Sequence, residues 1–418
     1  MIKTTLLGEV IEDQLNKFKS KDAGIPRDVD FDKYIKTKQV TVVSGIRRSG
    51  KSTLLVQFSR KFENFYYVNF DDDRLADFTV KDFQQLMIIL QKKYQSQVIF
   101  LDEIQNITGW ERFVRRIHDE GYKIFITGSN AKLLSSELAT HLTGRYVKIE
   151  LFPFSFKEFL HLKGIAYEKK SSAIKARVLK YFEIYLKYGG FPEFLKYDDE
   201  EFLKRIYDDI LYKDLLIRFK VKEIKAFKQL ASFLFTNFTK EISYNSLKNT
   251  LGFKSGTSVK NYVEFMRESF LVFELYKYDY SLKKQFVSDK KIYVIDNGLR
   301  NAVSFYFSED LGKMLENLVF MELKRRGKEI YYFKDKKECD FLIKEKSKIE
   351  GVLQVSKDMQ TGANEGREFD GLVEAMKKFD LKKGTVLTEY DEDSIKKDGF
   401  KINIVPIWKW LLDSKNKD

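Results

Sequence analysis

The stretch that decides the fold is Gly45-Ile46-Arg47-Arg48-Ser49-Gly50-Lys51-Ser52, which matches the pattern G-x-x-x-x-G-K-[ST]. It directly follows an apolar run, Thr41–Ser44, and precedes a stretch with helical periodicity, Thr53–Phe62. In this strand–loop–helix context the backbone N–H groups of the loop and of the first helical turn point at a bound phosphate. The pattern therefore predicts a phosphate-binding loop for a nucleoside triphosphate.

The side chains of this loop have distinct expected roles. Lys51 would reach the β and γ phosphate oxygens of ATP, and the Ser52 hydroxyl would bind Mg²⁺. The other residues expected to contact the nucleotide are Gly45, Arg48, Ser49, Gly50 and Thr53. The alternative is a glycine-containing turn whose Lys-Ser pair is incidental, and it does not account for the strand and helix on either side. ATP and Mg²⁺ are therefore the expected ligands.

A second apolar run, Val98–Leu101, ends in two acids, Asp102 and Glu103. Asp102 is placed to hold the Mg²⁺ shell through water, and Glu103 to polarise the attacking water. A strand that ends in Asp-Glu could also be a solvated edge, but a base beside the water has no use in a passive nucleotide binder. The pair therefore predicts hydrolysis of ATP.

Two further polar residues are candidates for the same site. Asn130 follows the apolar run that ends at Ile126, and it could bind the water or the γ-phosphate as a sensor; an ordinary Gly-Ser-Asn turn is the alternative. Arg145 lies before the run Tyr146–Ile149 and could reach a γ-phosphate in a neighbouring subunit of a homo-oligomer. A structural salt bridge is the alternative role for Arg145.

From residue 41 to about 156, short apolar runs alternate with helical patterns, which is typical of a parallel sheet with helices on both faces. The runs are Thr41–Ser44, Phe65–Val68, Val98–Leu101, Lys123–Ile126 and Tyr146–Ile149. After this α/β segment the pattern becomes helical. We therefore expect an ATPase core over 1–156, a helical lid over 157–220, a winged helix over 221–300 and a second α/β domain over 301–418.

The composition excludes several classes of protein. One cysteine, Cys339, excludes a disulfide scaffold and a cysteine-based zinc site. The three histidines are isolated, and no apolar run approaches the ~18 residues that span a bilayer. Acids near the N-terminus occupy the place of a signal peptide's apolar stretch. We therefore expect a cytoplasmic protein with no membrane contact.

The net charge of +13 favours a polyanionic partner, and it is distributed unevenly along the chain. The window 221–300 carries 14 basic and 8 acidic residues, whereas 301–418 carries 23 of each. If the protein holds DNA, the predicted winged helix is therefore the favoured point of contact.

Three stretches resemble the AAA+-type ATPases common in archaea and bacteria, which are related to signal-transducing and origin-binding ATPases. They are SGIRRSGKSTLL, VIFLDEIQNITGWERFVRRI and IFITGSNAKLLSSELATHLTGRYVKIELFPFSFKEFL. In that family a winged helix and a nuclease-like domain follow the ATPase. The resemblance implies the magnesium role for Asp102, the water-activating role for Glu103 and the sensor role for Asn130.

The resemblance extends to two shorter segments. The stretch YGGFPE at Tyr188–Glu193 is similar to the G-x-P signature of these relatives, whose proline-bearing segment approaches the nucleotide, and this implies such a place for Pro192. The resemblance also implies that Ile25-Pro26-Arg27 packs against adenine.

Residues 222–301 fit a winged helix, with helices expected at Ala226–Phe238, Ser243–Leu251 and Ser258–Phe270, followed by a strand pair. In such modules the third helix enters the major groove of DNA by its N-terminal end. The candidate DNA contacts are Ser258, Lys260 and Asn261 on that helix, with Lys283 and Lys284 in the wing. The alternative is that the module packs against the ATPase or a protein partner.

Residues 301–418 resemble restriction-endonuclease-like nucleases, which place a helix glutamate, a strand aspartate and an E-x-K sequence around Mg²⁺. The corresponding residues are Glu316, Asp340 and the stretch Gln354-Val355-Ser356. Gln354 replaces the acid and Ser356 the lysine, which removes a metal-binding charge and the group that stabilises the developing phosphorane. We therefore expect a nuclease-shaped but inactive domain.

These observations predict a Mg²⁺-dependent ATPase that is associated with DNA through its winged helix. Two alternatives remain open. One is a slow nucleotide switch that binds protein partners in signalling or defence, and the other is an ATP-coupled nuclease.

Overall fold

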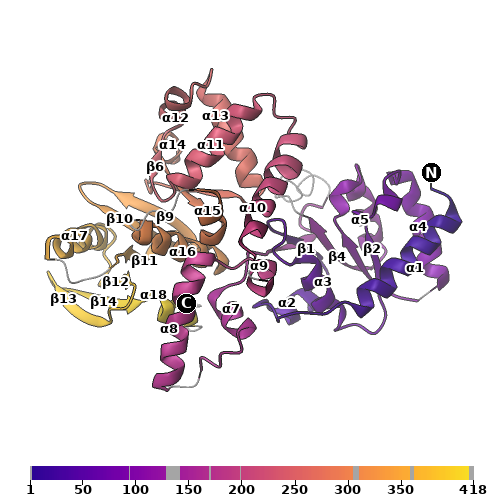
Figure 1. The fold of residues 1–418 in the computed structure, drawn as a ribbon, viewed down its shortest axis with the longest axis horizontal. Helices are drawn as coiled ribbons and strands as arrows, with labels where there is room; N and C mark the ends of the chain where they lie inside the picture. The colour runs from indigo at the N-terminus through magenta and orange to yellow at the C-terminus, as the bar shows by residue number, and fades with distance from the viewer. Residues whose placement is uncertain are drawn as a thin grey trace. The chain divides into compact units, whose positions relative to one another are not determined.

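The computed structural model describes residues 2–93, 95–128, 142–168, 171–197, 199–304, 310–357 and 362–413, the side chains of 200 and 362–368 excepted. The chain divides into two compact units (Figure 1). The first comprises Met1–Phe152 with Glu268–Phe270, and the second comprises Pro153–Arg267 with Leu271–Asp418. Each unit is described by itself below.

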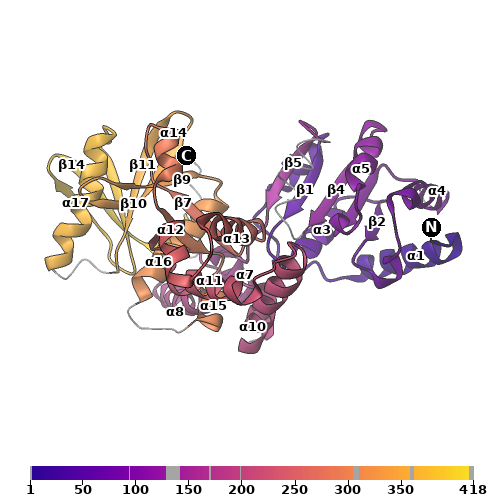
Figure 2. The same cartoon turned by 90° about the horizontal axis from the view of Figure 1, so that it is seen from above.

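The first unit is built on a five-stranded parallel sheet with strand order β2-β3-β4-β1-β5. Figure 2 shows β5, β1, β4 and β2 in this succession. The strands are β1 (Val40–Ser44), β2 (Tyr66–Asn69), β3 (Val98–Asp102), β4 (Lys123–Gly128) and β5 (Tyr146–Glu150). The parallel sheet expected from the five apolar runs is therefore confirmed.

Five α-helices among the described residues of the first unit surround this sheet: α1 (Thr4–Ser20), α2 (Phe31–Lys36), α3 (Lys51–Ser59), α4 (Phe83–Lys93) and α5 (Trp110–Asp119). Helix α1 buries Leu7, Ile11 and Phe18, whose spacing places them on one helical face. Phe18 stacks on Tyr67 of β2 with ring centroids 3.8 Å apart. A buried side chain of this size contributes roughly 1.5–3 kcal/mol, so these aromatic contacts hold the sheet that carries the phosphate loop.

The second unit begins with helices, as expected: α7 (Phe156–Leu162), α8 (Ser172–Tyr188), α9 (Pro192–Tyr197) and α10 (Glu200–Asp209), which continues as the π-helix η5 (Ile210–Ile217). Helix α7 starts with a reciprocal cap. The Glu158 N–H donates to Ser155 Oγ at 3.2 Å, and the Ser155 N–H donates to Glu158 Oε2 at 2.7 Å. This Ser-x-x-Glu cap satisfies donors that the first helical turn would otherwise leave unpaired.

The middle of the second unit contains the three expected helices and the expected strand pair. They are α11 (Ile224–Thr236), α12 (Tyr244–Leu251), α13 (Gly256–Glu268), β7 (Val272–Tyr276) and β8 (Lys290–Val294). A short strand, β6 (Glu241–Ile242), completes an antiparallel sheet of order β6-β8-β7. Strands β7 and β8 pair antiparallel, as expected, and their connection, which contains Lys283 and Lys284, carries a helix, α14 (Leu282–Val287), that the sequence did not predict.

The C-terminal part consists of a six-stranded mixed sheet with helices α15 (Asn297–Val303), α16 (Leu311–Arg325), α17 (Gly362–Lys378) and α18 (Ile407–Leu412). Its strand order is β13-β14-β12-β11-β10-β9. The strands are β9 (Glu329–Lys334), β10 (Glu338–Glu345), β11 (Lys348–Val355), β12 (Lys383–Thr388), β13 (Asp393–Lys397) and β14 (Phe400–Pro406).

Two apolar runs near the end of the chain, Thr385–Thr388 and Ile402–Ile407, predict two closing strands. They correspond to β12 and β14, but the structure adds a strand between them, β13, and a final helix, α18. Strands β13 and β14 form an antiparallel hairpin that turns at Asp398 and Gly399, both with positive φ. An Asp-Gly pair favours such turns, but the charged residues of β13 gave no apolar run. Among the helices of the described residues, none has the length and apolar character needed to cross a membrane.

Candidate active site

The phosphate loop joins β1 to α3, and two of its glycines are required by its geometry. Gly50 caps α3 with a φ of 94°, a left-handed conformation that costs glycine little. A Cβ on Gly45 would lie 2.0 Å from the carbonyl oxygen of Leu151. The observed path of the loop therefore requires glycine at both positions.

Lys51, the first residue of α3, is buried and folds back over the loop. Its ammonium donates to the carbonyl oxygens of Gly45 at 3.2 Å and Ile46 at 3.1 Å. Ser52 and Thr53 follow in the first helical turn and are partly exposed, and the side chain of Arg48 is exposed. The cation and both hydroxyls thus lie where the loop meets the positive end of the helix dipole.

Two buried hydroxyls at this loop, Ser44 Oγ and Ser49 Oγ, have no hydrogen-bond partner among the described residues. A buried polar group without a partner costs about 1–3 kcal/mol. Together with the glycine cradle and the Lys51 ammonium, these hydroxyls form a set of hydrogen-bond donors that suits phosphate oxygens.

Asp102 lies at the end of β3 and is almost fully buried. Its Oδ2 accepts a 3.1 Å hydrogen bond from the Tyr67 hydroxyl, and its Oδ1 accepts a hydrogen bond from Thr127 Oγ1. Burial, and then the charge of Asp102, raises the pKa of Tyr67, so the phenol stays a donor. The carboxylate is thereby held in one orientation at the sheet edge.

Glu103 has a left-handed backbone, with a φ of 52°, and a partly exposed side chain. Its N–H donates to Thr127 Oγ1 at 3.0 Å, and its Oε2 accepts a hydrogen bond from Gln105 Nε2. Such a conformation in a residue other than glycine costs on the order of 1–3 kcal/mol and is common at functional sites. Thr127 therefore links Asp102 to Glu103, a role that the sequence did not reveal.

The strand register brings these acids to the edge of the sheet that carries the phosphate loop. Ser44 of β1 pairs with Gly128 of β4, and Leu101 of β3 pairs with Ile126 of β4. Since the strands are parallel, their carboxyl ends meet at one edge, where ligands bind in α/β proteins. The loop residues, Asp102 and Glu103 thus lie at a common edge.

Three further predicted residues have different outcomes. Asn130 falls outside the described residues. Arg145 Nε lies 3.4 Å from Asp119 Oδ1 of the same chain, so a salt bridge is present and the role across a subunit interface stays a prediction. Pro192 begins α9 of the second unit, and its approach to nucleotide also stays a prediction.

Arg27 contacts the phosphate loop itself. Its guanidinium donates to the carbonyl oxygens of Ser49 and Phe152, both at 2.7 Å, and its N–H donates to Gln57 Oε1 at 3.2 Å. Arg27 therefore braces the loop through its backbone. The adenine contact implied for Ile25-Pro26-Arg27 stays a prediction.

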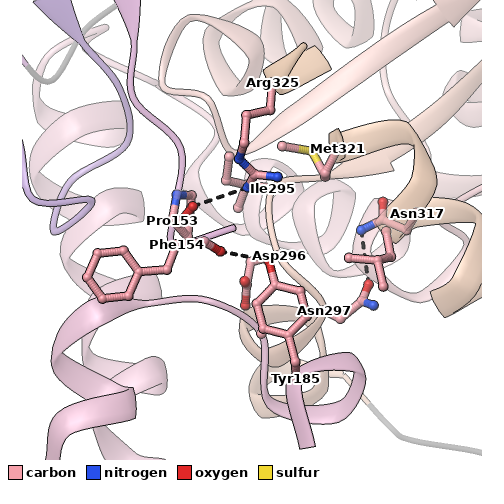
Figure 3. A pocket seen from close by; sticks show the side chains of 11 residues that line it. Pro153, Phe154, Tyr185, Ile295, Asp296, Asn297, Asn317, Met321 and Arg325 are labelled. Carbon is pink, nitrogen blue, oxygen red and sulfur yellow. Dashed lines mark hydrogen bonds between the residues drawn. The ribbon is translucent and has the colours of Figure 1, made fainter. Parts of the chain in front are cut away.

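The Gly189-Gly190-Phe191-Pro192 segment packs on the turn that follows β8. Figure 3 shows Asp296 of this turn beside Phe154 and Tyr185. The Gly190 N–H donates to Asp296 Oδ2 at 2.7 Å, and a Cβ on Gly190 would lie 2.2 Å from the Phe154 carbonyl oxygen. The Tyr185 hydroxyl donates a hydrogen bond to the Phe154 carbonyl oxygen at 2.6 Å. The cavity here has a volume of about 20 Å³, enough for one water, so the glycines serve close packing within the second unit.

The candidate DNA contacts lie on α13 and α14. Lys260, Asn261, Lys283 and Lys284 are exposed. Ser258 is partly buried, and its N–H donates to Ser255 Oγ at 3.1 Å while the two hydroxyls lie 3.0 Å apart. The structure therefore presents four of these five side chains to solvent and uses Ser258 in the helix cap.

The structure brings Glu316, Asp340 and Gln354 together. The Asp340 N–H donates to Gln354 Oε1 at 3.2 Å, and the Lys291 ammonium lies 3.0 Å from both Glu316 Oε1 and Asp340 Oδ1. The sequence did not reveal the role of Lys291, the second residue of β8. Two lysines at the start of a strand do not indicate which acids they contact. Within the described residues, no group of three or more His, Cys, Asp or Glu side chains could hold a metal ion.

Comparison with protein families divides the chain into three matched segments. Residues 37–160 match an AAA domain, residues 179–310 match a domain of unknown function, DUF8612, and residues 311–410 match another, DUF4143.

The chain is similar over nearly its full length to two uncharacterized proteins. It is 39% identical to MJ1544 of Methanocaldococcus jannaschii, covering 98% of this chain and 96% of the relative. It is 34% identical to a protein of Haemophilus influenzae, covering 92% and 95%. Among solved structures, the Aeropyrum pernix ORC1 protein in complex with DNA matches with a TM-score of 0.31 and 12% identity, covering 72% of this chain and 90% of that chain.

Proposed function

The chain belongs to the same protein family as MJ1544 of Methanocaldococcus jannaschii, and from its AAA domain and the geometry of the phosphate loop we propose that it hydrolyses ATP with Mg²⁺. The observation that carries the proposal is the placement of Asp102 and Glu103 at the sheet edge that holds the loop. A nucleotide binder without turnover would use Asp102 to hold Mg²⁺, but it would not need a water-activating base such as Glu103.

Each residue of the site has a defined part in this mechanism. The loop N–H groups and Lys51 bind the phosphates, and Ser49 Oγ offers a hydroxyl that has no hydrogen-bond partner within the described part of the chain. When bound, Mg²⁺ supplies neutralisation of phosphate charge, and Ser52 and Asp102 would hold it. Glu103 orients the attacking water and accepts its proton, and Thr127 fixes the position of Glu103.

Variants of two site residues test the ATPase. Lys51→Ala should abolish ATP binding, because it removes the loop's only ammonium. Glu103→Gln should keep ATP binding and reduce turnover to background. Glu120→Gln is a matched control, since Glu120 is an exposed glutamate paired with Arg116 at the end of α5. Wild-type turnover in Glu103→Gln would contradict the assigned mechanism.

A second part of the proposal is that residues 221–300 form a winged helix that binds duplex DNA. Two observations support this. The segment consists of three helices and a sheet of order β6-β8-β7. Basic side chains on α13 and α14 are exposed. Phosphate contacts by lysines release counterions, so binding should weaken steeply with salt. Fluorescence anisotropy with a labelled duplex would measure this, and ATPase rates with and without DNA would show any coupling.

The alternative role as a slow nucleotide switch predicts no DNA effect and nucleotide-dependent binding of a protein. We further propose that 301–418 is a nuclease-shaped domain without cleavage activity, because Gln354 and Ser356 stand where an acid and a lysine are needed. The divisions 1–156, 157–220, 221–300 and 301–418 belong to the same proposal.

A further inference from the structure

A buried ammonium lies among three carboxylates in the second unit. Lys291 Nζ is 3.0 Å from Glu316 Oε1, 2.6 Å from Glu338 Oε1 and 3.0 Å from Asp340 Oδ1. The Lys291 side chain is only 4% exposed. The cation comes from β8 and the acids from α16 and β10, so one lysine joins three elements that are distant in sequence.

The charges at this acidic centre are coupled. Burial disfavours the ammonium, but the attraction of Glu316, Asp340 and Glu338 outweighs it and raises the pKa of Lys291 well above its usual value. Burial raises the pKa of Glu316 to about 7, against the attraction of Lys291. The Tyr293 hydroxyl donates to Glu316 Oε1 at 2.6 Å. The single positive charge of Lys291 thus faces three acidic side chains.

The protein already uses both oxygens of Asp340. Oδ1 contacts Lys291, and Oδ2 accepts a 3.0 Å hydrogen bond from the Val355 N–H. Gln354 contributes an uncharged amide, whose oxygen accepts from the Asp340 backbone. Buried carboxylates of this kind need a compensating cation, and Ca²⁺ or Mg²⁺ commonly supplies it. Here a side chain of the same chain is in contact with all three acids.

We infer that Lys291 is the built-in cation of this acidic centre, where it takes the place of a divalent metal ion and joins β8 to α16 and β10 without metal. This inference does not depend on the ATPase proposal, because every residue involved lies in the second unit. It assigns the acids a binding role, which is to hold the ammonium of the neighbouring strand.

Lys291→Met tests the role as counter-ion. Breaking a buried ion pair on one side leaves uncompensated charge, and the unfolding constant should rise on the order of 10²–10³-fold. Lys290→Met is the matched control, since the Lys290 ammonium donates to the carbonyl oxygens of Phe286 and Ser288, both at 2.8 Å. This control should lose less stability. Adding Glu316→Gln to Lys291→Met should lower the unfolding constant at least tenfold, because it removes an uncompensated acid. Adding Glu316→Gln to Lys290→Met should not lower the unfolding constant.

If Lys291→Met is as stable as the wild type, the inference is wrong. If that variant does not fold, Mn²⁺ binding to the full chain remains decisive. Electron paramagnetic resonance of nucleotide-free protein should give the same number of bound Mn²⁺ ions for the wild type and for Asp340→Asn. A bound Mn²⁺ that Asp340→Asn abolishes would show that the centre takes metal and would overturn the inference.

Discussion

The backbone N–H of Gly190 donates a 2.7 Å hydrogen bond to Oδ2 of Asp296, which joins the turn before α9 to the turn after β8. Asp296 Oδ1 accepts a second hydrogen bond from the Leu299 N–H at 2.9 Å and so caps α15. A single buried carboxylate therefore ties together two turns that are far apart in the sequence. The first two predictions follow from this junction.

Gly298→Ala should destabilise the protein. A Cβ on Gly298 would lie 1.9 Å from the carbonyl oxygen of Tyr188. Because this oxygen belongs to the backbone, the clash can be relieved only by moving the main chain. The expected loss is about 1–3 kcal/mol in the free energy of unfolding, measured by urea denaturation. Gly312→Ala is the control, since a Cβ there meets nothing within 4 Å and a helical Gly→Ala change gains up to about 1 kcal/mol. Equal stability of the two variants would contradict this packing.

Asp296 should make stability depend on pH. Burial raises the pKa of Asp296 to about 6, from a reference of 3.8, although backbone N–H groups oppose the shift. Between pH 4 and 6 the folded state therefore binds more protons than the unfolded state, and stability falls as pH rises. A shift of this size corresponds to about 3 kcal/mol.

The measurement for Asp296 compares urea unfolding of the wild type and of Asp296→Asn from pH 4 to 7. The wild type should lose stability relative to the variant as pH rises to about 6, and the difference should then stay constant. Parallel stability curves over the whole range would show that Asp296 does not titrate in this way.

Thr127→Val should slow ATP turnover without preventing ATP binding. The threonine hydroxyl accepts from the Glu103 N–H at 3.0 Å and donates to Asp102, so valine removes both restraints at once. Small displacements of catalytic groups cost up to about 10²-fold, and we expect a 10- to 100-fold lower kcat. Thr127→Ser keeps the hydroxyl and should keep most of the activity. A normal kcat in Thr127→Val would remove Thr127 from the mechanism.

Lys260→Ala should weaken duplex binding, if residues 221–300 hold DNA. Its ammonium is exposed on α13, and loss of one phosphate contact should reduce the slope of log affinity against log salt by about 1. Lys225→Ala on α11 is the control for loss of an exposed positive charge elsewhere in the same module. Identical salt slopes for the two variants would indicate that α13 does not contact DNA.

The sequence predicted the structure best where consecutive residues form one local feature, such as a loop or a strand. The loop Gly45–Ser52, the strand that ends in Asp102 and the parallel sheet follow from glycine positions, apolar runs and their spacing. These are local properties, since a turn or a strand is specified by consecutive residues. The hairpin of β13 and β14 was missed because its first strand is charged and exposed, so its hydrophobic pattern is weak.

The sequence by itself determined the phosphate loop, the Asp-Glu strand end and the parallel sheet of the first unit. Only the tertiary structure revealed that Thr127 links the two acids, that Arg27 braces the loop and that Lys291 compensates Glu316, Glu338 and Asp340. The physical reason is that a buried polar group must find a partner, but the partner is whichever side chain the topology brings within about 3 Å. Strand register and domain packing decide that neighbour, and no local pattern in the sequence records it.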